Sequence, residues 1–66
     1  MSNLQDRRKK AGFSQTQLAA RVEGLSVRTL QHYEQGTLDI NKAAALIVWR
    51  ISVALGCEVG DILEID

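Results

Sequence analysis

Signals for helix starts and helix ends recur along this 66-residue chain, and they limit its possible folds more than any other feature. Ser2-x-x-Gln5 and Ser14-x-x-Gln17 both match the capping box, in which a serine and a glutamine side chain bind free backbone amides at a helix start. Three glycines follow helical runs and suit the left-handed position that closes a helix, namely Gly12, Gly36 and Gly56. These signals predict helices over residues 3–11, 15–22, 27–35, 42–55 and 59–64.

Apolar residues recur at helical spacing within the predicted helices and define stripes that would face a common core. Asp39 and Asn41 are suited to cap the fourth of these helices. Alternation of apolar and polar residues occurs only near the C-terminus, where the segment is short and better interpreted as a helical turn than as a strand. We therefore predict an all-α fold with one domain over residues 1–66.

The composition excludes several classes of protein. The only cysteine, Cys57, cannot form an internal disulfide, and with a single histidine it is too little for a zinc site. The most apolar stretch, residues 43–57, contains Arg50 and is shorter than the ~20 residues that span a bilayer, and the N-terminus lacks a signal-peptide core. No nucleophile, base and orienting group stand in a plausible catalytic relation. We expect a cytoplasmic protein that is not an enzyme and uses no cofactor, metal, membrane or small-molecule substrate.

Charge is distributed unevenly along the chain, although eight basic and eight acidic residues cancel overall. Residues 1–32 hold six basic and two acidic side chains, a net charge of +4. Residues 33–66 hold two basic and six acidic side chains, a net charge of −4. If the first half forms one face, that face has the positive potential expected of a phosphate-binding surface.

Residues 14–36 have the organisation that points most clearly to a function. A predicted helix of about eight residues, a turn at Gly24 and a second helix of about nine residues form a helix-turn-helix. In this motif the first helix braces on the DNA backbone while the second enters the major groove. Ala19 is small enough to lie where the two helices cross, and Leu18 and Leu30 would fasten the pair to the core.

The chain resembles the Cro and phage-repressor family of helix-turn-helix proteins, also called Xre-like, over nearly its whole length. The resemblance rests on a basic first helix followed by short motifs in the family's order: Gly12-Phe13-Ser14-Gln15, Leu18-Ala19, Leu25-Ser26, Tyr33-Glu34-Gln35-Gly36 and Ala54-Leu55-Gly56. It implies a compact five-helix, lambda-repressor-like domain that binds double-stranded DNA. In one departure, Glu23-Gly24 resembles a one-residue insertion in the turn, which bears on the tilt of the second motif helix.

Helix geometry and the resemblance together indicate which side chains would read bases. In a helix over residues 27–35, with its cap at residue 26, the outward positions match those that touch base edges in the family: Ser26, Val27, Arg28, Gln31 and His32. Arg28 could bind guanine O6 and N7 with two hydrogen bonds, a contact worth about 1–3 kcal/mol of discrimination. Val27 could meet a thymine methyl, and His32 could donate to a base or a phosphate. A merely solvated surface position is the alternative for Arg28 and His32.

Other matched positions imply contacts with the DNA backbone and one internal ion pair. The family's phosphate-contacting regions correspond here to Ser14, Gln15, Gln35 and Lys42, and such contacts set the register without carrying sequence information. Arg8 and Glu34 match an arginine and a glutamate that family members pair, so the resemblance implies a salt bridge from the first helix to the recognition helix. That pair would be architectural, because a partly buried charge left alone costs more than the pair yields.

The fourth predicted helix has apolar residues on a second side, where Trp49 and Val53 are a candidate surface for a dimer or another partner. Trp49 could equally cap the core of the monomer. We expect a small bacterial or phage-type transcriptional regulator, a repressor by family default, that binds an inverted-repeat operator as a homodimer. The alternative is a protein-binding adaptor or antitoxin-like module on the same scaffold. An RNA-binding domain would need exposed aromatic platforms that this chain lacks.

Overall fold

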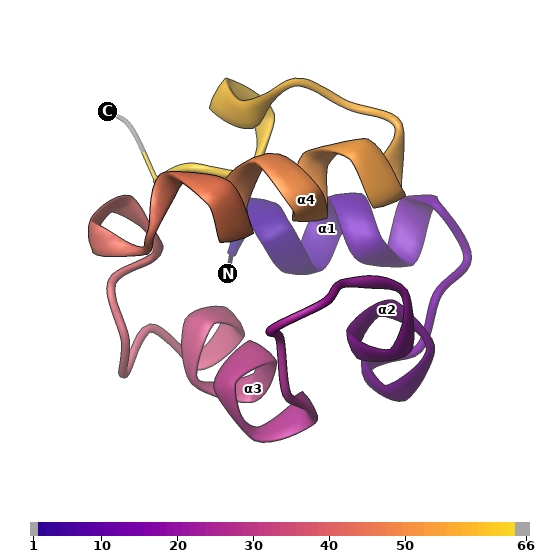
Figure 1. Ribbon diagram of the computed structural model, residues 1–66, viewed down its shortest axis with the longest axis horizontal. Coiled ribbons are helices and arrows are strands. Elements are labelled where there is room, and N and C mark those ends of the chain that lie inside the picture. The colour runs from indigo at the N-terminus through magenta and orange to yellow at the C-terminus, as the bar shows by residue number, and fades with distance from the viewer. Residues whose placement is uncertain (1, 65–66) are drawn as a thin grey trace.

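The computed structural model describes residues 2–64, which form four α-helices and two short 3₁₀ turns and contain no β-strand (Figure 1). In chain order these elements are α1 (Asn3–Lys10), α2 (Gln15–Arg21), α3 (Val27–Gln35), the turn η1 (Ile40–Lys42), α4 (Ala45–Leu55) and the turn η2 (Val59–Asp61). The prediction of an all-helical fold is confirmed, and the predicted bounds 27–35 are those of α3. The predictions for the two C-terminal helices need correction.

The fourth helix begins later than predicted, at Ala45. The carboxylate of Asp39 accepts a hydrogen bond from the amide of Asn41 at 2.9 Å. Asp39 therefore caps the start of η1 and not the start of α4. The side chain of Asn41, expected to cap α4, binds both the amide and the carbonyl of Glu64, at 2.9 and 2.8 Å. Residues 43–44 have ψ of 154° and 134°, and α4 starts without a side-chain cap because its N-cap, Ala44, has no side-chain acceptor.

The fifth helix predicted over residues 59–64 is wrong, because only the single 3₁₀ turn η2 forms there. Glu58 and Asp61 hold this turn together, since the amide of Glu58 donates to the carboxylate of Asp61 and the amide of Asp61 donates to the carbonyl of Glu58, both at 3.0 Å. The next side chain, that of Ile62, is fully buried, and the backbone of Glu64 is bound by the side chain of Asn41. These contacts hold the segment in a non-helical path, so the described chain has four α-helices where five were expected.

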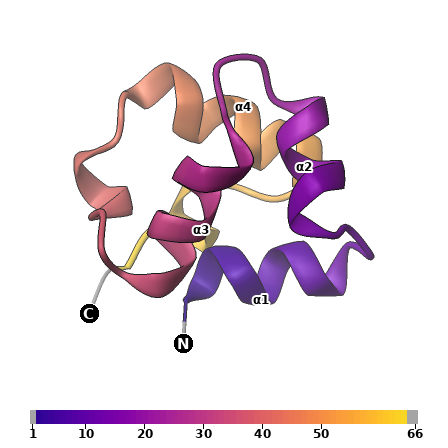
Figure 2. The same cartoon turned by 90° about the horizontal axis from the view of Figure 1, so that it is seen from below.

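One hydrophobic core joins the elements, and each α-helix contributes at least one fully buried side chain to it. The largest of these side chains are Leu4, Leu18, Leu30, Ile51 and Ile62. Burying a side chain of this size contributes about 1.5–3 kcal/mol to stability. α2 and α3 pack on each other, α3 packs on α1, and α2 packs on α4. α1 and α4 lie on the same side of the α2–α3 pair in Figure 1 and at its opposite edges in Figure 2.

The turn between α2 and α3 rests on α4. The amide of Leu25 donates to the carbonyl of Val22 at 3.1 Å, which makes a β-turn with Gly24 in its third position at φ +87°. Such a positive φ in this position is typical of a type II turn and favours glycine. A Cβ atom on Gly24 would lie 3.0 Å from the Cδ1 atom of Ile47, and Arg50 Nη1 donates to the carbonyl of Glu23 at 3.1 Å. The turn is therefore seated on α4 through its backbone.

Replacement of Gly24 by alanine is expected to lower the free energy of unfolding by about 1–3 kcal/mol, because the backbone is left-handed there and the added methyl group crowds Ile47. The measurement is urea unfolding followed by circular dichroism. Gly60→Ala is the matched control, since Gly60 has no neighbouring atom within 4 Å of a built Cβ and its φ lies outside the left-handed region. Equal stability of the two variants would contradict the packing of the turn on α4.

Candidate nucleic-acid interface

The recognition helix α3 turns one face to the core and the other to solvent. Leu30 is fully buried in the middle of the helix, and this fixes the orientation of the remaining side chains. Of the five side chains predicted to read bases, Ser26 and Arg28 are exposed and Val27, Gln31 and His32 are half-buried. Within residues 2–64 no hydrogen bond or ion pair engages the guanidinium of Arg28. That group is therefore available to a partner.

Ser26 defines the start of α3. Its hydroxyl oxygen accepts a hydrogen bond from the amide of Thr29 at 3.1 Å, and the hydroxyl donates to the side-chain oxygen of Thr29 at 2.9 Å. The side chain thus caps the helix, as expected for a serine at this position. A base contact through the same hydroxyl would compete with these bonds.

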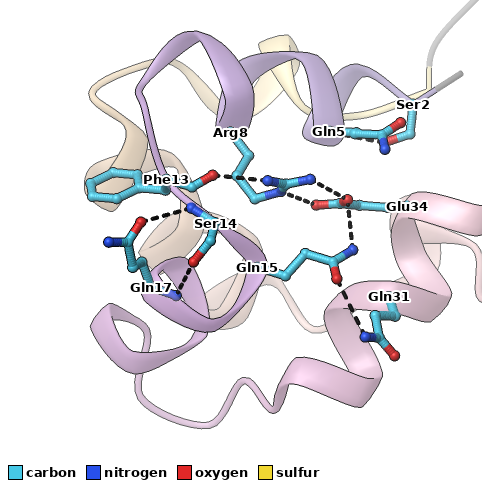
Figure 3. Close-up of polar contacts among 9 residues, drawn as sticks. All are labelled: Ser2, Gln5, Arg8, Phe13, Ser14, Gln15, Gln17, Gln31 and Glu34. Atoms are coloured by element: carbon cyan, nitrogen blue, oxygen red, sulfur yellow. Dashed lines mark hydrogen bonds and ion pairs between the residues drawn. The ribbon is translucent and has the colours of Figure 1, made fainter.

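A buried ion pair fixes the other end of α3. Arg8 of α1 and Glu34 of α3 form two parallel hydrogen bonds, from Nε to Oε2 at 2.7 Å and from Nη2 to Oε1 at 2.9 Å (Figure 3). The side chains are 9% and 2% exposed. The third guanidinium nitrogen, Nη1, donates to the carbonyl of Phe13 at 2.8 Å, so α1, α3 and the loop before α2 are held by one side chain. Hydrogen bonding to Glu34 raises the pKa of Arg8 against the opposing effect of burial, which keeps the guanidinium charged.

Gln15 extends this network to the middle of α3. Its Nε2 atom donates to Oε1 of Glu34 at 3.0 Å, and its Oε1 atom accepts from Nε2 of Gln31 at 3.3 Å (Figure 3). Arg8, Glu34, Gln15 and Gln31 therefore form one chain of polar contacts that joins α1, α2 and α3. The carbonyl oxygen of Gln31 points away from Gln15, so this side chain can still offer an acceptor outward (Figure 3).

His32 is oriented by a residue that the sequence patterns did not single out. Its Nδ1 atom lies 2.7 Å from the hydroxyl oxygen of Thr37, whose amide donates to the carbonyl of His32 at 3.0 Å. The other ring nitrogen, Nε2, has no partner among residues 2–64, and no polar side-chain atom there is both buried and unpartnered, so Nε2 is open to solvent. The only signal for Thr37 was its place directly after Gly36, which closes α3 in the left-handed conformation.

The residues predicted to contact phosphates lie at three places on the surface. Ser14 and Gln17 form a complete capping box at the start of α2, with bonds of 2.8 and 3.0 Å, so the hydroxyl of Ser14 is already used as an acceptor (Figure 3). Gln15 is half-buried in the network described above. Gln35 is exposed at the end of α3, and Lys42 is exposed in η1, not at the start of α4 as predicted.

The second side of α4 presents an exposed apolar stripe. Leu46, Trp49 and Val53 are 53%, 56% and 59% exposed, and their spacing puts them on one face of the helix. Trp49 therefore does not cap the core as the alternative interpretation supposed. The stripe belongs to a helix whose other face, with Val48 and Ile51, is buried.

Three further features of residues 2–64 concern metal ions, membrane-spanning helices and the thiol of Cys57. These residues contain no group of three or more histidine, cysteine, aspartate or glutamate side chains that could hold a metal ion. None of their helices is long and apolar enough to cross a bilayer. Cys57 is half-buried, and burial raises the pKa of its thiol, with a further increase from Asp61 and a decrease from Arg7. The thiolate is thereby disfavoured.

α2, a glycine-containing turn and α3 define a helix-turn-helix domain. The start of α3 is exposed, and its C-terminal end is held by the buried Arg8–Glu34 pair. The family model described as Helix-turn-helix matches residues 4–62, and the chain belongs to this Xre/Cro-like family of DNA-binding transcription regulators. No curated protein and no solved structure gives a significant match to the chain.

Replacement of Glu34 by glutamine is expected to lower the free energy of unfolding by about 3–5 kcal/mol, because it leaves the charge of Arg8 buried without a counter-charge. Thermal unfolding by circular dichroism measures the loss, and the double variant Arg8→Met/Glu34→Met should recover much of it. Arg7→Gln is the control, since it removes the charge from a partly exposed 3.4 Å pair with Asp61, leaves the bond from the Glu58 amide to Asp61 in place, and should cost less than about 1 kcal/mol. A similar loss in both single variants would contradict the central role of the buried pair.

Proposed function

We propose that this protein binds double-stranded DNA sequence-specifically as a small bacterial or phage-type transcriptional regulator, with residues 1–66 acting as one DNA-binding domain. The observation that carries the proposal is the unpartnered guanidinium of Arg28 on the exposed start of α3, a helix fixed at its other end by the Arg8–Glu34 pair. An α-helix fits the major groove of B-DNA, where each base pair presents its own pattern of donors and acceptors. In this proposal α3 lies in the groove with its N-terminal part against the bases.

The proposed division of roles follows the position of each side chain. Base contacts are assigned to the outward residues of α3, namely Ser26, Val27, Arg28, Gln31 and His32. Arg28 would bind guanine with two hydrogen bonds, and Gln31 would offer the carbonyl oxygen that Gln15 does not use. Contacts with the DNA backbone are assigned to residues at the start of α2, at the end of α3 and in η1, namely Ser14, Gln15, Gln35 and Lys42.

The protein is further proposed to act in the cytoplasm as a homodimer on an inverted-repeat operator and to repress transcription. Two-fold symmetry would bring two copies of α3 into successive major grooves, about 34–36 Å apart. The exposed stripe of Leu46, Trp49 and Val53 supports self-association, because monomers rarely expose large apolar patches. A shift from dimer to monomer in Trp49→Ala, measured by analytical ultracentrifugation, would support this surface, and an unchanged dimer would exclude it.

Arg28→Ala and Lys42→Ala are expected to affect DNA binding in different ways. Removing Arg28 should relax the preference at one base pair by about 1–3 kcal/mol. Removing Lys42 should weaken binding to all sequences alike and reduce the salt dependence, the slope of log K against log salt, by about 0.9. Both side chains are exposed and are therefore expected to be dispensable for folding, whereas Gln15 also holds Glu34 and would confuse the comparison.

The measurement for this pair is titration of each variant against a library of operator sequences at several salt concentrations. Equal losses on every sequence for both variants would contradict the division into base-reading and phosphate-binding residues. Binding that does not change with salt would contradict DNA binding as the function.

The same exposed stripe on α4 supports a second candidate function, a protein-binding adaptor or antitoxin-like module. The two functions predict different results for the purified protein. A gel shift with the DNA upstream of its own gene supports the regulator. A stoichiometric protein partner that binds through Trp49, without retention of DNA, supports the adaptor.

A further inference from the structure

The turn that leads into α3 is held by the backbone contacts with α4 described above, and Arg50 makes the polar one. The acceptor of its hydrogen bond is the carbonyl of Glu23, not the carboxylate, at 3.1 Å. The side chain of Arg50 is half-buried and lies beside Gly24, whose built Cβ would be 3.8 Å from Nη1. Figure 2 shows the turn rising beside α4. A bond to a backbone carbonyl fixes the path of the chain whatever side chain stands at position 23.

The two ends of α3 are held by different means. Its C-terminal end is fixed by the ion pair of Glu34 with Arg8 and by the bond from Gln15. Its N-terminal end starts at the cap Ser26, two residues after Gly24; the buried Leu25 between them ties it to the core, and Arg50 binds the backbone of the turn. A shift of the turn would therefore swing the start of α3 about its anchored end.

The part of α3 that would swing is the part that the proposed function puts against the bases. Bidentate recognition of a base edge depends on donor–acceptor distances of about 2.7–3.2 Å and on near-linear geometry. A displacement of even a fraction of an ångström at the helix start would therefore weaken base contacts. Contacts with phosphates tolerate it better, because they depend mainly on charge.

We propose that Arg50 is a positioning residue for base recognition: by holding the carbonyl of Glu23 against α4, it sets the place and tilt at which α3 starts. This inference rests on the proposed function. Arg50 acts through the turn and makes no contact with DNA. The sequence resembles the Cro and phage-repressor family with a one-residue insertion in this turn. Arg50, together with Ile47, which packs against Gly24, would accommodate that extra residue.

The test compares Arg50→Met and Arg50→Lys with the unchanged protein. Methionine keeps much of the apolar stem but removes the donor and the charge, whereas lysine keeps the charge and one donor group. Arg21→Met is the matched control for charge. Arg21 and Arg50 line one surface hollow, but Arg21 stacks on Phe13, with 4.8 Å from its guanidinium carbon to the ring centre. Glu23→Ala is the control for the acceptor, because it leaves the backbone carbonyl in place.

For each variant the folded fraction is first measured by urea unfolding at low temperature. Binding is then measured for the operator found by binding-site selection with the unchanged protein and for a scrambled duplex, at several salt concentrations. Amide hydrogen exchange at Leu25, whose amide bonds to Val22 within the turn, reports on the turn without DNA.

Arg50→Met is expected to lose up to about tenfold in affinity for the operator, after correction for the folded fraction, because ordering the freed turn on binding should cost at most the energy of one exposed hydrogen bond from a charged group. Its affinity for the scrambled duplex should match that of Arg21→Met, its salt slope should be unchanged, and exchange at Leu25 should be faster. Arg50→Lys should recover much of the operator affinity, and Glu23→Ala should bind the operator like the unchanged protein.

Two results overturn the inference in distinguishable ways. Should Arg50→Met bind the operator as tightly as Arg21→Met and select the same sequence, the positioning role is wrong while the proposed function stands. Should the unchanged protein select no DNA sequence, the proposed function fails and this inference fails with it. If Arg50→Met does not fold, Arg50→Lys decides: fast exchange at Leu25 with lowered operator affinity supports the role, and full operator affinity with fast exchange overturns it.

Discussion

The paired charges of Arg8 and Glu34 are the interaction on which the rest of this structure depends. Two charges are withdrawn from water almost completely, and this is tolerable only because each is met by its partner and by further hydrogen bonds. The geometry meets that condition: the guanidinium uses all three nitrogens, on two carboxylate oxygens and one backbone carbonyl. An apolar pair of similar size could hold the helices as firmly, but it would not specify how they are oriented about one another.

That orientation matters because the pair lies at the C-terminal end of α3 and fixes the direction of the helix there. Gln15 connects the ion pair to Gln31. In this way Gln31, an outward residue of α3, is linked to the buried charges of Arg8 and Glu34. At its N-terminal end the same helix depends on a turn seated on α4. α3 is thus a helix fixed at both ends by groups from three other elements, with its outward residues left open between them.

α4 has two different faces, and both bear on function. Its inner face fills the core with Val48 and Ile51 and supports the turn with Ile47 and Arg50. Its outer face, with Trp49, leaves apolar surface in water, which costs stability unless something covers it. A partner bound on the outer face would lie one helix away from the turn that positions α3.

Local patterns in the sequence determined where the first three helices lie and where α3 begins and ends, because serine caps, a closing glycine and apolar spacing act within a few residues of one another. Matched motifs also pointed to the pairing of Arg8 with Glu34. Only the tertiary structure decided the end of the chain, where Asn41 binds Glu64 across 23 positions and so delays α4 and prevents a fifth helix. It also decided that Gln15 binds Gln31 and that Arg50 binds the turn, because hydrogen bonds between distant segments depend on how the helices pack and leave no periodic trace in the sequence.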